Sequence, residues 1–143
     1  MASLVYNPFK YRQLGDTSIT PINLKTDTIK IALLTSTYTP SDEHDFYDDI
    51  TNEVSGTGYT AGGATLTVTT SQDNTDNEGV FDAVDVSWTI TGSFTARYAV
   101  IYKSTGSAAT SPLICLIDFG TNKSVDNETF QIIFAAEGIL NLT

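Results

Sequence analysis

Apolar and polar residues alternate with a period of two along much of the chain, which is typical of β-strands that bury one face. The longest alternating run is 94–103, where Phe, Ala, Tyr and Val share one face and Thr, Arg and Lys recur on the other. Residues 29–35 and 112–119 form apolar runs that predict buried strands. Further strands are expected at 64–70, 86–90 and 130–134.

Turn-forming residues separate these runs. Residues 56–63 are rich in glycine, and their spacing fits neither a Walker loop nor a dinucleotide fingerprint, so we expect a structural turn. Residues 104–111 and 120–127 have loop composition. One short helix is predicted from Pro40 to about Ile50, because a Thr cap, a first-turn proline and acidic residues occur together there.

About seven or eight short strands at this spacing predict an all-β fold, namely an antiparallel β-sandwich or a jelly-roll-like single domain with one short helix. The length of 143 residues suits one domain with its own core. We expect the β-sandwich domain at 26–143, preceded by an N-terminal arm or first strand at 1–25.

Residues 1–25 lack steady periodicity and combine aromatic with basic side chains. Two interpretations are open: a first strand followed by a loop, or an arm that lies on a neighbouring subunit. In the second case the aromatic, apolar and basic side chains would bind the partner. The candidate partner-binding residues are Val5, Tyr6, Phe9, Lys10, Tyr11 and Arg12.

Charge limits the classes of partner. The chain has 17 Asp and Glu against 7 Lys and Arg, a formal net charge of −10. Nucleic-acid and anionic-membrane binders need an excess of basic residues, so neither partner is expected. The acidic residues gather at 42–53 and 73–85, where a solvated acidic surface is favoured over a calcium site. No cofactor is predicted.

Candidate catalytic residues are few. Cys115 is the only cysteine and lies in an apolar run, so we expect it to be buried and unreactive. His44 is the only histidine, no nucleophile elbow accompanies it, and an exposed helical position is expected. Paired carboxylates in a β-sandwich could hydrolyse glycosides or bind carbohydrate with calcium, as an alternative centred on 42–53. The favoured prediction is a protein that is not an enzyme.

A set of segments in 29–143 resembles a group of small β-rich virion structural proteins of tailed bacteriophages. The segments that carry the resemblance are 29–40, 44–49, 52–63, 81–83 with Trp88, 95–103, 111–114, 118–120 and 138–143. The resemblance implies a non-enzymatic component of the virion. Residues before Ile29 are less typical of the group, so their role in docking rests on composition alone.

The favoured expectation is a head decoration or cement protein that binds the major capsid protein or other virion subunits. Copies of the chain are expected to form a homo-oligomer on the particle, with the acidic body facing outward. The alternatives are a tail or adaptor-type protein with contact loops at 104–111 and 120–127, or a carbohydrate- or receptor-binding module.

Overall fold

The computed structural model describes residues 3–15 and 20–143, and its architecture is mostly β, as the sequence predicts. Every strand pair is antiparallel, in keeping with a sandwich. The first elements are β1 (Leu4–Val5), α1 (Asn7–Gln13), β2 (Ile29–Leu34), the 3-10 turn η1 (Tyr47–Asp49), β3 (Ala64–Thr65), β4 (Val68–Asp73) and β5 (Glu78–Ala83). They are followed by β6 (Val86–Thr89), β7 (Ser93–Lys103), the 3-10 turn η2 (Ala108–Thr110), β8 (Leu113–Asp126), β9 (Thr129–Ile132) and β10 (Leu140–Leu142).

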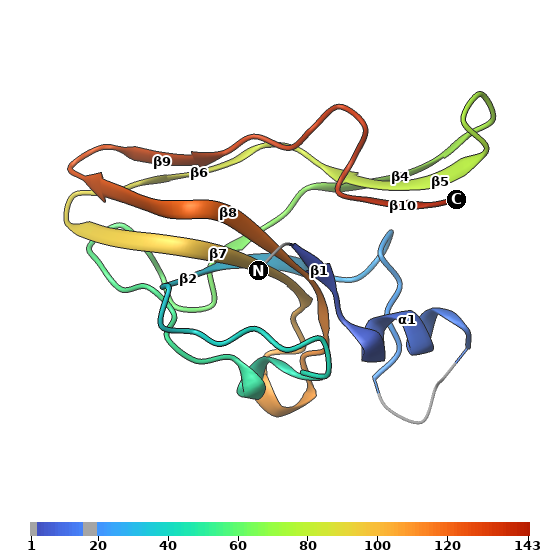
Figure 1. Cartoon of the computed structure of the whole chain (residues 1–143), viewed down its shortest axis with the longest axis horizontal. Coiled ribbons are helices and arrows are strands. Elements are labelled where there is room, and N and C mark those ends of the chain that lie inside the picture. The colour runs from blue at the N-terminus through green and yellow to red at the C-terminus, as the bar shows by residue number, and fades with distance from the viewer. Residues whose placement is uncertain (1–2, 16–19) are drawn as a thin grey trace.

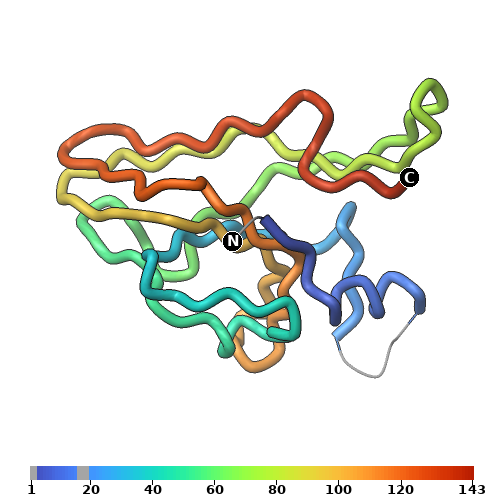
Figure 2. Tube along the Cα trace, in the orientation of Figure 1, coloured from blue at the N-terminus to red at the C-terminus, as the bar shows by residue number. Residues whose placement is uncertain are grey.

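The strands form three sheets arranged in layers. A five-stranded sheet has the order β1-β8-β7-β2-β3, a three-stranded sheet has the order β10-β5-β4, and β6 pairs with β9. In Figure 1 the β6-β9 ribbon lies above β7 and β8, while the three-stranded sheet extends to the right of it. The tube in Figure 2 shows that the hairpin joining β4 and β5 reaches away from the rest of the chain.

The core lies against the five-stranded sheet, where β2 and the second half of β7 are almost wholly buried. The long connection between β2 and β3 covers part of β7 through ring contacts of Tyr38 with Tyr98 and of Tyr47 with Tyr102. From the β6-β9 ribbon, the ring of Phe130 packs on that of Phe94. Such coverage explains why the apolar runs in these strands are continuous.

The helix predicted at 40–50 is wrong. Only the 3-10 turn η1 forms there, because the main chain of this segment is hydrogen-bonded to the start of β8 and to the residues that lead into it. The amide of Tyr47 donates to the carbonyl of Ser111 at 2.8 Å, and the amide of Leu113 donates to the carbonyl of Asp45 at 2.9 Å. These long-range bonds replace the local bonds that a helix needs. Among the described residues, an α-helix forms instead at α1, near the N-terminus.

The loop predicted at 120–127 is also wrong, since β8 continues to Asp126. The register between β7 and β8 is interrupted by a bulge. Ala96 pairs with Lys123 and Tyr98 with Asp118, so the single residue Arg97 of β7 lies opposite residues 119–122 of β8. Gly120 has a φ of 79° at this bulge, a conformation that favours glycine. Composition indicated a loop because the bulge needs the same flexible polar residues.

The glycine-rich segment 56–63 forms turns, as predicted, and lies unusually close to neighbouring strands. A Cβ on Gly63 would lie 1.8 Å from the carbonyl oxygen of Ile31, and φ there is 75°. A Cβ on Gly58 would lie 2.2 Å from the carbonyl oxygen of Thr89. Glycine is therefore required at both positions by close main-chain contact.

Candidate functional site

The predicted partner-binding residues divide into a buried and an exposed group. Tyr6, Phe9 and Arg12 are buried in the chain's own core. Val5 is half-buried in β1, which pairs with β8. Lys10 and Tyr11 are exposed on α1.

Burial of the first group follows from how the N-terminal segment is attached. The amide of Tyr6 donates to the carbonyl of Ile114 at 3.2 Å, and the amide of Asn7 donates to the carbonyl of Asp42 at 2.8 Å. The Tyr6 hydroxyl lies 3.5 Å from that of Tyr38, and burial raises the pKa of Tyr6. The surface that this segment offers to another molecule is therefore limited to its exposed side chains, Lys10 and Tyr11 among them.

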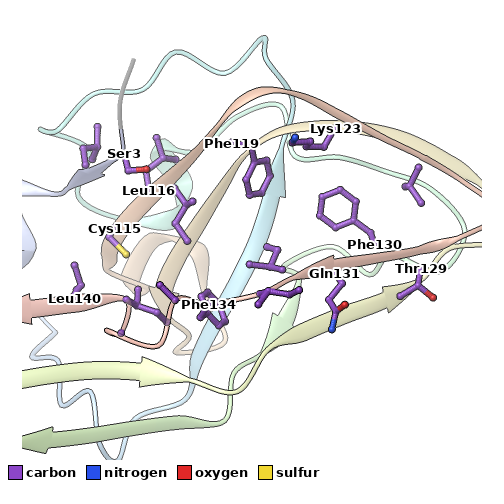
Figure 3. A pocket seen from close by; sticks show the side chains of 18 of the residues that line it. Ser3, Cys115, Leu116, Phe119, Lys123, Thr129, Phe130, Gln131, Phe134 and Leu140 are labelled. Atoms are coloured by element: carbon purple, nitrogen blue, oxygen red, sulfur yellow. The ribbon is translucent and has the colours of Figure 1, made fainter.

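An apolar groove of about 690 Å³ lies between β8 and β9 and was not predicted. Its walls come from β1, β8, β9 and the segment between β9 and β10. Figure 3 shows Leu116, Phe119 and Phe130 directed toward this space. The rings of Phe119 and Phe130 are 6.2 Å apart. The alternation of Phe130, Ile132 and Phe134 could have indicated an apolar surface, but which neighbour covers it depends on the tertiary structure.

The bulge in β8 helps to form the groove. Phe119, at the bulge, lies in the groove wall and directly follows Asp118, whose carboxylate is held by hydrogen bonds. Arg97 donates from Nε to Asp118 Oδ1 at 2.7 Å, and the Gly120 amide donates to the same oxygen at 2.8 Å. The hydrogen bond from Arg97 lowers the pKa of Asp118 to about 2. Asp118 therefore stays ionised and fixes the shape of the bulge at neutral pH.

The thiol of Cys115 lies in the groove wall, and the residue is buried as predicted. Burial raises the pKa of Cys115 to about 12. Because the thiolate is the nucleophilic form, this thiol is unreactive at neutral pH. The groove therefore offers an apolar surface for contact. The sulfur atom of Cys115 in its wall does not act as a nucleophile at neutral pH.

The acidic segment 42–53 has structural roles that charge counting did not predict. Asp45 forms an ion pair with Arg12, and Asp49 accepts the amides of Asp45 and Phe46. Glu53 accepts the Tyr59 hydroxyl and the Gly62 amide, both at 2.7 Å. Asp45, Asp49 and Glu53 are therefore used to hold loops together, whereas Asp42, Glu43 and Asp48 of the same segment are exposed.

The first part of the second acidic segment, residues 73–78, forms the tip of the β4-β5 hairpin. Oxygen atoms of Asp73, Asp76 and Glu78 lie within 4.8 Å of one another. Asp73 Oδ1 also accepts the amides of Thr75 and Asp76, at 2.8 and 3.2 Å, which closes the turn. The tip is an acidic, largely exposed surface, whereas Asp82 farther along the segment is half-buried in β5.

His44 does not lie on a helix, contrary to prediction. Its Nδ1 is 2.7 Å from the Tyr38 hydroxyl, and the residue is half-buried. This contact continues the hydroxyl pair of Tyr38 and Tyr6, so the histidine joins the loop after β2 to the N-terminal segment. Its position indicates a structural role.

No helix among residues 3–15 and 20–143 has the length and apolar character needed to cross a membrane. Comparison with known proteins leaves the family open. No protein-family model, no curated protein and no solved structure matches the chain.

Proposed function

We propose that this chain is a non-enzymatic structural subunit of a tailed-bacteriophage virion, bound to the outside of the head as a decoration protein. The resemblance over 29–143 is the reason for proposing a virion protein. The structural observation that supports an assembly role is the β10-β5-β4 sheet. In β4, the four residues from Thr69 to Gln72 are all exposed, so neither face of this part of the strand is covered by the described chain.

A strand exposed on both faces gains little from burial within its own chain. Figure 1 shows the β4-β5 hairpin reaching beyond the layers that form the core. Projecting strands of this kind are suited to contacts between subunits, where the partner supplies the missing cover. The acidic tip of the hairpin would favour a partner surface with basic residues.

Exposed residues of the N-terminal segment offer a second contact. Tyr11 on α1 is 63% exposed, Leu14 directly after the helix is 85% exposed, and Lys10 on α1 is also exposed. Aromatic side chains are common anchors in protein interfaces. In the proposed role these three residues would bind the major capsid protein or a neighbouring virion subunit, and the acidic remainder would face outward.

The non-enzymatic part of the proposal is supported by the chemistry of the candidate residues. Cys115 is buried with a raised pKa, and His44 is engaged with Tyr38. Asp45 and Glu53 are held by Arg12, Tyr59 and the Gly62 amide.

The test is an electron-microscopy map of the intact particle made by the genome that encodes this chain, combined with its copy number by quantitative mass spectrometry. Density for the chain on the outer head surface, at a copy number comparable with that of the major capsid protein, is expected. A handful of copies located on the tail would contradict decoration and favour the tail or adaptor alternative. Absence from purified particles would contradict a virion role altogether.

A further inference from the structure

The two edges of the β6-β9 ribbon differ in how they are covered. The β6 side is covered where β6 ends, by the glycine-rich segment: the amides of Thr91 and Gly92, just after β6, both donate to the carbonyl of Thr57, at 3.0 and 3.2 Å. Gly58 lies so close to Thr89 that a side chain would not fit between them. On the other edge, β9 pairs with no further strand in the part of the chain that the structure describes.

Main-chain groups point outward from this open edge. Ile90 donates to the carbonyl of Glu128 at 3.0 Å, which sets the phase of the antiparallel ladder between β6 and β9. Since main-chain groups alternate between the two sides of a strand, the amide and carbonyl groups of Phe130 and Ile132 point toward β6. Thr129 and Gln131 therefore present their amide and carbonyl groups on the open side.

The open edge of β9, a strand of four residues, lacks three of the usual features that prevent pairing. Natural edge strands are often protected by charged residues, proline or a bulge. Residues 129–136 contain neither a charged residue nor proline, and the register of β9 with β6 is regular. Ile133, next along the chain, is 72% exposed. The apolar groove beside β9 adds further surface that this chain leaves uncovered.

We propose that β9 pairs with β9 of a second copy of this chain, antiparallel about a two-fold axis near Gln131. With this register Thr129 lies opposite Ile133 of the other copy and Gln131 opposite its equivalent, so the outward main-chain groups of all three residues are used. The β6-β9 ribbons of two copies then form one continuous sheet. The two apolar grooves, which include Phe119 and Phe130, face each other across the axis.

Charge selects a second copy as the occupant. A net charge of −10 opposes self-association over most of the surface. Among the residues that line the groove, however, Lys123 and Glu128 are the charged ones, and their charges cancel. This face is therefore locally neutral, and each copy carries both signs for pairing across the axis. An acidic or basic partner peptide would gain no net attraction here.

The test is sedimentation velocity of the purified chain and of two matched variants, Gln131→Lys and Gln131→Glu. Gln131 is exposed, so both variants should fold, which near-UV circular dichroism and a thermal melt will verify. Each variant places like charges opposite each other at the axis. The dimer dissociation constant should rise roughly fivefold or more in each. An equal mixture of the two should restore dimer formation, because Lys then faces Glu.

The matched control is Gln72→Lys and Gln72→Glu, which change an exposed glutamine on β4, away from β9, and should leave the dimer unchanged. A wild-type chain that stays monomeric would overturn the proposal. Dimers that persist equally in both Gln131 variants, or variants whose mixture gives no more dimer than either alone, would overturn it as well. The measurement uses the purified chain without particles, so its outcome is independent of the proposed virion role.

Discussion

The guanidinium of Arg12 lies 2.7 Å from the carboxylate of Asp45 and 5.1 Å from the centre of the Phe46 ring. Its side chain is 1% exposed. The pair joins α1 to the loop after β2, two segments that are far apart in the sequence. A basic residue that the sequence offered as a partner anchor is thus used to hold the N-terminal segment on the chain's own body.

Asp45→Asn should lower the free energy of unfolding by about 2 kcal/mol, because the buried Arg12 cation would lose its counter-charge while Asp45 itself is partly exposed. Chemical denaturation measures the change. The control is Asp48→Asn, an exposed carboxylate in the same segment, for which we expect a change within about 0.5 kcal/mol. Equal effects of the two substitutions would contradict a stabilising role of the ion pair.

Gly63→Ala should destabilise the fold by about 4 kcal/mol, because the new Cβ would lie 1.8 Å from the carbonyl oxygen of Ile31 at a φ of 75°. Gly106→Ala is the matched control: its φ is 89°, but no atom lies within 4 Å of the added Cβ. Only the conformational cost of about 1 kcal/mol is expected there. Comparable losses at the two positions would show that β3 does not approach β2 as closely as described.

Stability between about pH 4 and pH 2 should depend on Asp118. Its pKa in the folded chain, about 2, is lower than in an unfolded chain, about 3.9, because Arg97 donates to it. The ionised form therefore stabilises the fold above about pH 4, and this contribution is lost as the pH falls toward 2.

Asp118→Asn should consequently lower the melting temperature at pH 6 and much less at pH 2. Thermal melts across this range measure the difference, with Asp126→Asn, an exposed carboxylate on the same strand, as the control. A difference from wild type that stays constant with pH would show that the effect of Asp118 is not electrostatic.

Cys115 should react with a thiol reagent such as Ellman's reagent only after unfolding, because burial raises its pKa to about 12. At pH 8 the native chain is expected to remain unlabelled, and the full signal should appear in denaturant. Rapid labelling of the folded chain would mean that the wall between β1, β8 and the groove opens readily.

Local pattern was sufficient for much of the architecture. Alternation over 94–103 and the apolar run at 29–35 predicted β7 and β2, because side chains of a strand alternate between faces whatever the strand's partner. Burial of Cys115 followed from its apolar neighbours. The glycines of 56–63 predicted turns, since their conformational freedom is a local property.

Features that depend on pairing between distant segments were decided by the tertiary structure. The segment 40–50 has helix signals, but its main chain bonds to Ser111 and to Leu113 at the start of β8. The helix α1 forms instead at Asn7–Gln13, with a first-turn proline and basic residues in its last turn but no side-chain cap. Composition could not tell that 120–127 continues β8 through a bulge.

The same division applies to the candidate contact surfaces. The sequence alone determined an acidic, β-rich chain with aromatic and basic residues near its N-terminus. Only the tertiary structure decided that Tyr6, Phe9 and Arg12 face inward, and that segment 56–63 covers the end of β6 while the outer edge of β9 has no strand partner among the described residues. The physical reason is that hydrophobic burial and main-chain pairing depend on which distant segments meet, whereas periodicity and charge are properties of neighbouring residues.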